Sequence, residues 1–223
     1  MMELFEDDEL NFINNPEKFV EDRWKVVEKE FGDLVDGGSI DSFIGKSFGD
    51  CVKGKIFERK VYGHFFRKKF ISQFSYSLWD DKSTAIVKER SNKIVSVASG
   101  GGFIEWLLQR EGIDLIATDE TEYGFWDNGF TDIEVIDAAC AVRKYSDRDV
   151  LMVWANYQSE MAFEVAKAME SGRYLFYVGE NRGGCVAAED FFNYGENHFD
   201  IELGHNIPTW PGLHDGLYVL KKK

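Results

Sequence analysis

Cysteine and proline are both scarce in this chain, with three of each among 223 residues. Cys51, Cys140 and Cys185 are odd in number, lie far apart and form no C-x-x-C pair, which argues against a disulfide framework or a cysteine-rich zinc site. His198 and His205 have no metal-like spacing with acids or cysteines, so we expect no metal. A reducing, intracellular setting fits this composition best, and we expect a cytoplasmic location.

Long apolar runs are also missing. None approaches the roughly 20 residues that a membrane helix needs, so no membrane partner is expected. The first nine residues are acidic, unlike a secretory signal or a transit peptide. Because 44% of the chain is hydrophobic and 15% is aromatic, we expect a packed core rather than extensive disorder. The length favours one domain with a small appended segment.

Basic residues are fewer than acidic ones: 26 basic and 40 acidic side chains give a formal net charge of −14. Phosphates would be repelled by such a surface, so a nucleic-acid partner is not expected. Residues 53–69, the basic island, are an exception in which lysines and arginines alternate with aromatic side chains. This pattern can bind single-stranded nucleic acid or line the entrance to a site for an anionic substrate. We favour an amphipathic helix that packs against the acidic remainder.

The first ninety residues have a helical pattern. An asparagine followed by proline at residues 15–16 fits a helix cap and a first helical position, and apolar residues then recur at helical spacing. The pattern predicts one helix that starts at residues 15–16 and is ended, or separated from the next element, by the glycine pair at residues 37–38, and a second helix over residues 55–74. We expect residues 1–90 to form a helical N-terminal cap.

From residue 91 onward, short apolar runs alternate with helical stretches. This alternation predicts an α/β fold with a doubly wound, mostly parallel sheet that has helices on both faces. Only a loop joins the last two runs, which predicts a terminal antiparallel hairpin. The predicted strands are residues 94–98, 114–118, 132–136, 149–154, 173–178, 198–207 and 217–220, and the predicted helices are residues 103–110, 159–170 and 186–194.

Three consecutive glycines, residues 100–102, follow the first strand, and Asp119 ends the second. Ligands of an open parallel sheet bind beyond the carboxyl ends of the strands, where the strand order reverses. Glycines let the backbone turn tightly beside a ligand, and the next helix offers N–H groups and the positive end of its dipole. Asp119 can accept two hydrogen bonds from ribose hydroxyls, and Asp137 can meet an adenine edge. This combination predicts an adenosine-containing cofactor.

The strand and glycine loop of residues 94–102, together with the closing strand pair, resemble class I S-adenosylmethionine-dependent methyltransferases. The resemblance covers residues 94–220 and implies a Rossmann-like, seven-stranded S-adenosylmethionine-binding domain over residues 91–223. A narrower likeness, from about residue 74 to the end, is to a little-described group of methyltransferase-like proteins. The segments that carry this narrower likeness are residues 76–79, 100–103, 154–157, 177–185 and 207–215.

The resemblance also implies which residues bind the cofactor. Gly100 and Gly102 would face its methionine part. Asp119 would hold the ribose hydroxyls. Asp137 and Ala138 would lie beside the adenine.

The chain departs from the family pattern at two places. Ser96 stands where the family has an acid, and Ala98 stands where it has the first glycine; a serine can still hydrogen-bond an ammonium group, but without the charge. Residues 154–157 stand where amino-group methyltransferases carry a polar residue, two prolines and an aromatic residue. Both prolines are missing here, so the amine-methylating role is not transferred. We expect Trp154 and Tyr157 to line the methyl-transfer pocket, Trp154 as a cofactor-binding residue and Tyr157 as a catalytic residue.

Two further loops carry candidate catalytic residues. Glu180 follows the fifth strand and can act as a base or anchor a substrate hydroxyl or amine, although it can equally cap the next helix. His214 lies between the last two strands and can remove a proton from a nucleophile, oriented by Asp215 or Glu180. The simpler interpretation of His214 is a surface histidine in a turn.

Methyl transfer from a sulfonium requires mainly alignment and desolvation, with a base if the acceptor is protonated. The function we expect is therefore an S-adenosylmethionine-dependent methyltransferase that acts on a small molecule or a protein side chain. The alternative is a catalytically inactive methyltransferase-like module that binds or scaffolds. A nicotinamide-dependent oxidoreductase ranks last, because its glycine spacing would require a glycine where Glu105 stands. No oligomeric state is predicted.

Overall fold

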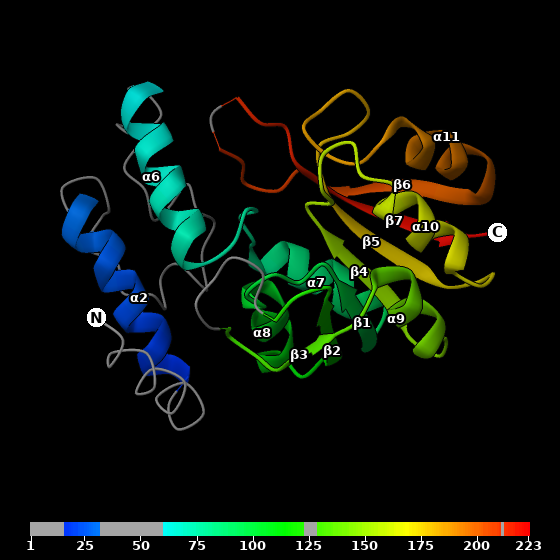
Figure 1. Cartoon of the computed structure of the whole chain (residues 1–223), viewed down its shortest axis with the longest axis horizontal. Helices are drawn as coiled ribbons and strands as arrows, with labels where there is room; N and C mark the ends of the chain where they lie inside the picture. The colour runs from blue at the N-terminus through cyan, green and yellow to red at the C-terminus, as the bar shows by residue number, and fades with distance from the viewer. Residues whose placement is uncertain (1–15, 32–59, 123–128, 211) are drawn as a thin grey trace.

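A computed structural model describes residues 16–31, 60–122, 129–210 and 212–223. The described chain forms a seven-stranded sheet in the order β3-β2-β1-β4-β5-β7-β6 (Figure 1). The first five strands are parallel, and β7 pairs antiparallel with both β5 and β6. This confirms the predicted doubly wound sheet with a terminal antiparallel hairpin.

The strands are β1 Lys93–Val97, β2 Asp114–Asp119, β3 Ile133–Val135, β4 Asp149–Val153, β5 Tyr174–Gly179, β6 Phe199–His205 and β7 Gly216–Lys222. The described helices are α2 Pro16–Phe31, α6 Lys60–Gln73, α7 Asp81–Arg90, α8 Phe103–Arg110, α9 Ala138–Lys144, α10 Met161–Ala168 and α11 Glu189–His198.

Each predicted strand is present, and α8 has the predicted bounds. The prediction of a helix over 186–194 is wrong at both ends. Ala188 is extended (φ −80°, ψ 159°), so α11 begins only after it, and the helix continues to His198. This longer helix also delays the start of β6. Cys51 and residues 53–59 of the basic island lie outside the described residues.

Two helices, α7 and α9, were not predicted, and each starts at an aspartate cap. The carboxylate of Asp80 accepts a hydrogen bond from the backbone N–H of Ser83 at 2.8 Å. The carboxylate of Asp137 accepts one from Cys140 at 2.9 Å. Such bonds satisfy N–H groups that the first helical turn would leave unpaired.

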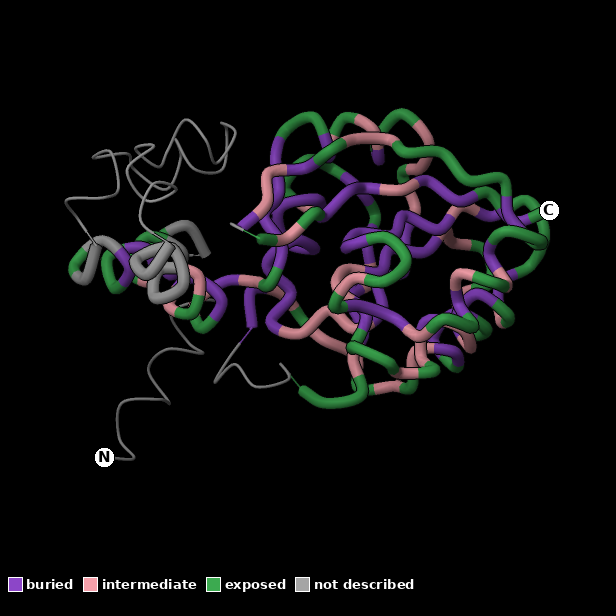
Figure 2. Tube along the Cα trace, turned by 90° about the horizontal axis from the view of Figure 1, so that it is seen from above, coloured by how far each residue is buried: buried purple, intermediate pink, exposed green. Residues whose placement is uncertain are grey.

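Two hydrophobic clusters cover the two faces of the sheet, because successive residues of a strand point to opposite sides. Ile94 of β1 belongs to the cluster that includes α8 residues, and its neighbour Val95 belongs to the cluster that includes residues of α9, α10 and α11. Buried segments accordingly run through the middle of the molecule (Figure 2). This layering leaves the carboxyl ends of the central strands as the place where loops from both faces meet.

The helices α2 and α6 lie side by side (Figure 1) and share the core of α8. The rings of Phe19 and Phe130 are 5.4 Å apart, and those of Phe74 and Phe103 are 5.0 Å apart. The N-terminal segment is thus packed onto the sheet through aromatic contacts. The division into a cap and a second domain near residue 90 stays a prediction.

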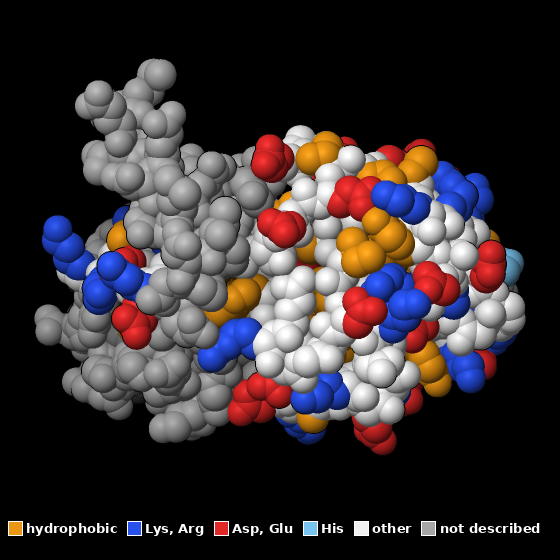
Figure 3. All heavy atoms as spheres, turned by 90° about the horizontal axis from the view of Figure 1, so that it is seen from below, with side chains coloured by type: hydrophobic (Ala, Val, Ile, Leu, Met, Phe, Trp, Pro, Cys, Tyr) orange, Lys and Arg blue, Asp and Glu red, His pale blue; other side chains and the backbone are white. Residues whose placement is uncertain are grey.

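Cationic side chains hold together the amino ends of the parallel strands. Arg173, which directly precedes β5, is 8% exposed and donates hydrogen bonds to the carbonyl oxygens of Arg148 at 2.6 Å, and of Val142 and Tyr145 at 3.1 Å each. Arg148 forms an ion pair with Asp114 at 2.9 Å. Elsewhere acidic and basic side chains are interspersed on the surface (Figure 3).

No helix in the described ranges is long and apolar enough to cross a membrane.

Candidate functional site

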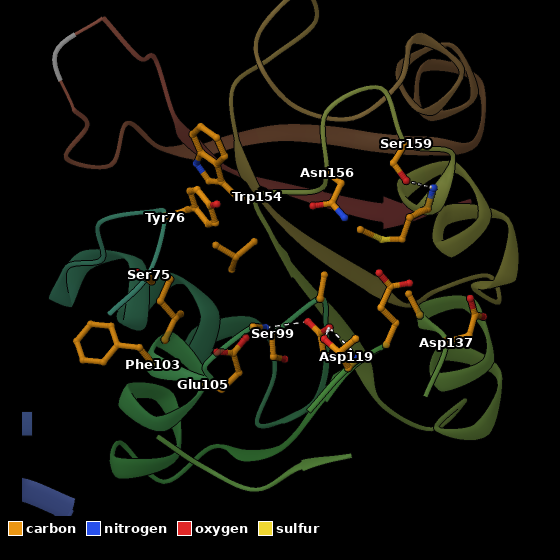
Figure 4. A pocket seen from close by; sticks show the side chains of 18 of the residues that line it. Ser75, Tyr76, Ser99, Phe103, Glu105, Asp119, Asp137, Trp154, Asn156 and Ser159 are labelled. Carbon is orange, nitrogen blue, oxygen red and sulfur yellow. Dashed lines mark hydrogen bonds between the residues drawn. The ribbon is translucent and has the colours of Figure 1, made fainter. Parts of the chain in front are cut away.

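A cleft of about 530 Å³ lies beyond the carboxyl ends of β1, β2 and β4 (Figure 4). The chain crosses to the other face of the sheet between β1 and β4, so this is where the strand order reverses and where open α/β sheets bind ligands. The lining residues come from the segment after α6, the glycine loop and the first turn of α8, the end of β2 and the loop after it, and the segments after β3 and β4 up to the first turns of α9 and α10. They are Ser75, Tyr76, Ala98, Ser99, Gly100, Glu105, Asp119, Glu120, Asp137, Ala138, Trp154, Asn156, Glu160, Met161 and Glu164.

The loop after β1 takes up the left-handed backbone conformation three times. Ala98 (φ 55°), Gly100 (φ 56°) and Gly102 (φ 72°) all have positive φ, so Ala98 adopts a conformation that glycine would favour. Ala98 and Gly100 line the cleft, whereas Gly102 does not. A Cβ at Gly102 would lie 2.8 Å from the side chain of Thr131, so this glycine allows the loop to pack closely before β3.

Asp119 stands at the end of β2 and turns its carboxylate toward the glycine loop. One oxygen accepts the backbone N–H of Gly100 at 2.9 Å, and the other accepts that of Thr121 at 3.2 Å. The hydroxyl of Thr121 also donates to that second oxygen at 3.4 Å, so the acceptor capacity that Asp119 keeps for a ligand in the cleft is on the oxygen bonded to Gly100.

Asp137 and Ala138 form the opposite end of the cleft, at the start of α9. The hydrogen bond from the backbone of Cys140 lowers the pKa of Asp137. Asp137 is therefore both the cap of α9 and an ionised group on the cleft wall.

Glu105, in the first turn of α8, is the cleft residue that the sequence analysis missed. It is 2% exposed and accepts a hydrogen bond from the hydroxyl of Ser96 at 2.6 Å. Burial raises the pKa of Glu105 to about 7, against the lowering effect of the Ser96 bond. Ser96 itself is fully buried and does not line the cleft. A signal was present in the sequence, because Glu105 interrupts an otherwise apolar stretch over residues 103–108.

Trp154 forms one wall of the cleft together with Tyr76 (Figure 4). Their rings are stacked at 5.6 Å and 13°. Trp154 has a positive φ of 53°, and its indole N–H donates to the carboxylate of Asp215 at 3.0 Å. Burial raises the pKa of Asp215 to about 6. The guanidinium of Arg67, from α6, lies 5.6 Å from the Trp154 ring, so one residue of the basic island reaches this wall.

The three predicted catalytic residues lie outside the cleft lining. Glu180 is 7% exposed and accepts the backbone N–H groups of Cys185 at 2.8 Å and His214 at 3.0 Å. The imidazole Nδ1 of His214 is 3.5 Å from Glu180, but the ring itself is largely exposed. Tyr157 is 62% exposed, and its hydroxyl accepts a hydrogen bond from Gln158. The structure thus brings Glu180 and His214 together, and their catalytic roles stay predictions.

The charged residues of the described lining are all acidic. There are six carboxylates and no lysine, arginine or histidine. Among the described residues, one of the six forms an ion pair, namely Glu164 with Lys167 at 3.2 Å. A cleft lined by one sign of charge concentrates ligands of the opposite sign. No group of three or more His, Cys, Asp or Glu residues in the described part of the chain is placed to hold a metal.

No protein-family model matches the chain, and no curated protein matches it. Similar solved structures include the magnesium protoporphyrin IX methyltransferase of Synechocystis with bound S-adenosylmethionine, at 14% identity over 93% of this chain and 98% of that one, with a TM-score of 0.47. A TehB-like S-adenosylmethionine-dependent methyltransferase from Corynebacterium glutamicum is 16% identical over 74% of this chain and 100% of that one, with a TM-score of 0.46.

Proposed function

We propose that this chain binds S-adenosylmethionine in the acidic cleft and transfers its methyl group to a small molecule or a protein side chain. The observation that carries the proposal is the combination of a left-handed glycine loop with six carboxylates, at the point where the strand order reverses. S-adenosylmethionine carries a ribose, an ammonium group and a sulfonium cation. The cleft volume of about 530 Å³ lies within the usual range for pockets that bind small molecules.

The residues of the cleft fit the adenosine part and the ammonium group of such a cofactor. Asp119 has free acceptor capacity for a ribose hydroxyl, on the oxygen bonded to Gly100. The backbone of residues 98–100 is open to the methionine part. Ala138 and Met161 offer apolar surface for the adenine, with Asp137 at its edge.

Bound cofactor supplies a methyl group that is already activated by the sulfonium, so the protein contributes mainly alignment and exclusion of water. Tyr76 and Trp154 form a rigid wall on the acceptor side, and the hydrogen bond from Trp154 to Asp215 fixes the indole ring. Because Ser75 and Tyr76 follow α6, the N-terminal segment completes the cleft and would help to select the acceptor.

One observation favours the second candidate, a module that binds the nucleoside cofactor without turnover. None of the predicted catalytic residues Glu180, His214 and Tyr157 lines the cleft. A protonated acceptor would therefore need a base other than these three.

The test is the formation of S-adenosylhomocysteine by the full chain when it is incubated with S-adenosylmethionine and pools of small molecules or proteins. The methyltransferase proposal expects product formation that Asp119→Ala reduces and Asp200→Asn, an exposed carboxylate on β6, leaves unchanged. Cofactor binding without product in any pool would favour the binding module.

A further inference from the structure

Glu105 is a carboxyl group in an unusual position, because it is almost completely buried and yet belongs to the lining of the cleft. It sits in the first turn of α8, close to Ser99 (Figure 4). Its carboxyl accepts a hydrogen bond from the hydroxyl of Ser96 at 2.6 Å, and hydrogen bonds from Ser99 and from its own backbone N–H act in the same direction on its pKa. No ion pair to Glu105 is present among the described residues.

The groups that face Glu105 come from β1, the glycine loop and β2. Ser96 and Ser99 contribute hydroxyls, whose hydrogen bonds favour the ionised carboxyl. The charged neighbour is Asp119, which disfavours it. A buried carboxylate without a cation is costly, so the free protein holds this group close to the balance between its protonated and ionised forms.

Ser96 and Glu105 also explain the departure of the chain from the methyltransferase pattern. The loop acid of that pattern is replaced by Ser96, and the structure shows that Ser96 holds a carboxyl group that reaches the cleft from α8. A carboxyl group is therefore still present beside the glycine loop, and it is carried by α8.

We propose that Glu105 is the counter-ion for the ammonium group of the bound cofactor and that it releases its proton to solvent when the cofactor binds. This inference rests on the proposed function and adds to it a linkage between cofactor affinity and pH. Because the bound ammonium favours the ionised carboxyl, affinity rises as the pH rises through about 7, where Glu105 titrates in the free protein. Below that pH, affinity falls by up to about tenfold for each pH unit.

The test is calorimetric titration of the full chain with S-adenosylhomocysteine, which shares the ammonium group and undergoes no turnover. Each titration is repeated in phosphate and imidazole, which both buffer around pH 7 and differ in ionisation enthalpy, so that the difference in heat counts the protons taken up by the buffer. We expect release of about 0.9 proton at pH 6, about 0.5 at pH 7 and about 0.1 at pH 8, from a group with a pKa of about 7.

Two variants assign the proton to its source. Glu105→Gln keeps the shape of the side chain and an acceptor for Ser96, and we expect it to abolish the release and to weaken binding at pH 8 about tenfold. Ser96→Ala removes a hydrogen bond that favours the ionised carboxyl, so it should move the midpoint of release to higher pH. The matched control is Glu111→Gln, an exposed glutamate just beyond the end of α8, which should behave as the parent chain.

The outcomes separate this inference from the proposed function. Binding that releases no proton between pH 6 and pH 8 would overturn the role of Glu105, even if Glu105→Gln does not fold, because the parent chain alone gives this result. Proton release that persists in a folded Glu105→Gln variant would overturn it as well. The absence of any binding would instead overturn the proposed function.

Discussion

The strand β2 carries an aspartate at each end, and the two are used in different ways. Asp114, at the amino end, pairs with the guanidinium of Arg148 at 2.9 Å. Asp119, at the carboxyl end, accepts hydrogen bonds from the glycine loop and from Thr121, and no cation pairs with it among the described residues. Charges at the amino end are satisfied within the protein, whereas those at the carboxyl end keep capacity for a ligand.

The same contrast holds for the buried charges of the sheet. Arg173, at the amino end, has three carbonyl partners, whereas Glu105, at the carboxyl end, has a neutral hydroxyl. A buried charge is tolerated when it is hydrogen-bonded or can lose its charge. The amino end therefore contributes stability, and the carboxyl end carries an electrostatic cost that a bound cation relieves.

The largest expected effect concerns the amino end. Arg173→Met removes hydrogen bonds to three carbonyl groups at and after the end of α9, and leaves these groups partly unpaired. We expect the free energy of unfolding to fall by about 3–5 kcal/mol, measured by urea denaturation. Affinity of the folded protein for S-adenosylhomocysteine should be unchanged. Arg143→Met, on the exposed side of α9, is the control and should change stability by less than about 0.5 kcal/mol.

The carboxyl end should respond in the opposite way. Asp119→Ala removes the charged acceptor to which the ribose donates, and we expect binding of S-adenosylhomocysteine to weaken by about 1.5–3 kcal/mol, or roughly 10- to 150-fold. Asp114→Ala, at the other end of the same strand, should leave binding unchanged and cost up to about 1 kcal/mol of stability. Equal losses of affinity in both variants would contradict the division between the two ends.

A third comparison isolates the packing of the glycine loop at the carboxyl end of β1. Gly102 and Gly112 flank α8 and both have positive φ, but a Cβ meets Thr131 at 2.8 Å only at Gly102 and meets nothing within 4 Å at Gly112. In both variants the new alanine must adopt a left-handed backbone conformation, which strains the folded state. We expect Gly102→Ala to lower the free energy of unfolding by about 1 kcal/mol more than Gly112→Ala. Equal losses, measured by thermal denaturation, would show that the loop can shift away from Thr131.

The smallest effect is a pH dependence at a paired carboxylate. Burial tends to raise the pKa of Asp80, but hydrogen bonds from Ser83 and His205 outweigh it and the net pKa is lowered. Its stabilising contribution is thus complete above the unfolded pKa of 3.8 and is lost as the pH falls through the lower folded value. Asp80→Asn should be about 1 kcal/mol less stable than the parent chain at pH 6, with the difference shrinking below pH 4. A difference that stays constant with pH would contradict this assignment.

The order of strands and helices could be read from the sequence, because apolar runs of strand length alternate with helical patterns and the glycines mark the first turn. The start of α9 could have been read as well, since Asp137 was weighed as an adenine contact but its capping role was not used. Glu105 was missed for a physical reason. Its function depends on burial beside Ser96, nine residues away, and only the packing of α8 onto β1 creates that contact.

Glu180 and His214 show that a position at the end of a strand does not by itself place a side chain in the cleft. Glu180 and His214 do lie close together, but the carboxylate of Glu180 accepts hydrogen bonds from the backbone N–H groups of Cys185 and His214, which belong to two loops. A residue at the correct edge of the sheet can still face away from the cleft, and the sequence carries no signal for that direction.

The central claim is that the cleft, whose carboxylates mostly lack a cationic partner among the described residues, binds a nucleoside cofactor that carries an ammonium group. Its most direct test is calorimetric titration of the full, folded chain with S-adenosylmethionine and S-adenosylhomocysteine, with the anionic dinucleotide NAD as the control. The account predicts one site of micromolar affinity for the two sulfur nucleosides and no detectable binding of NAD. Binding of NAD alone, or of none of the three by a chain shown to be folded, would contradict it.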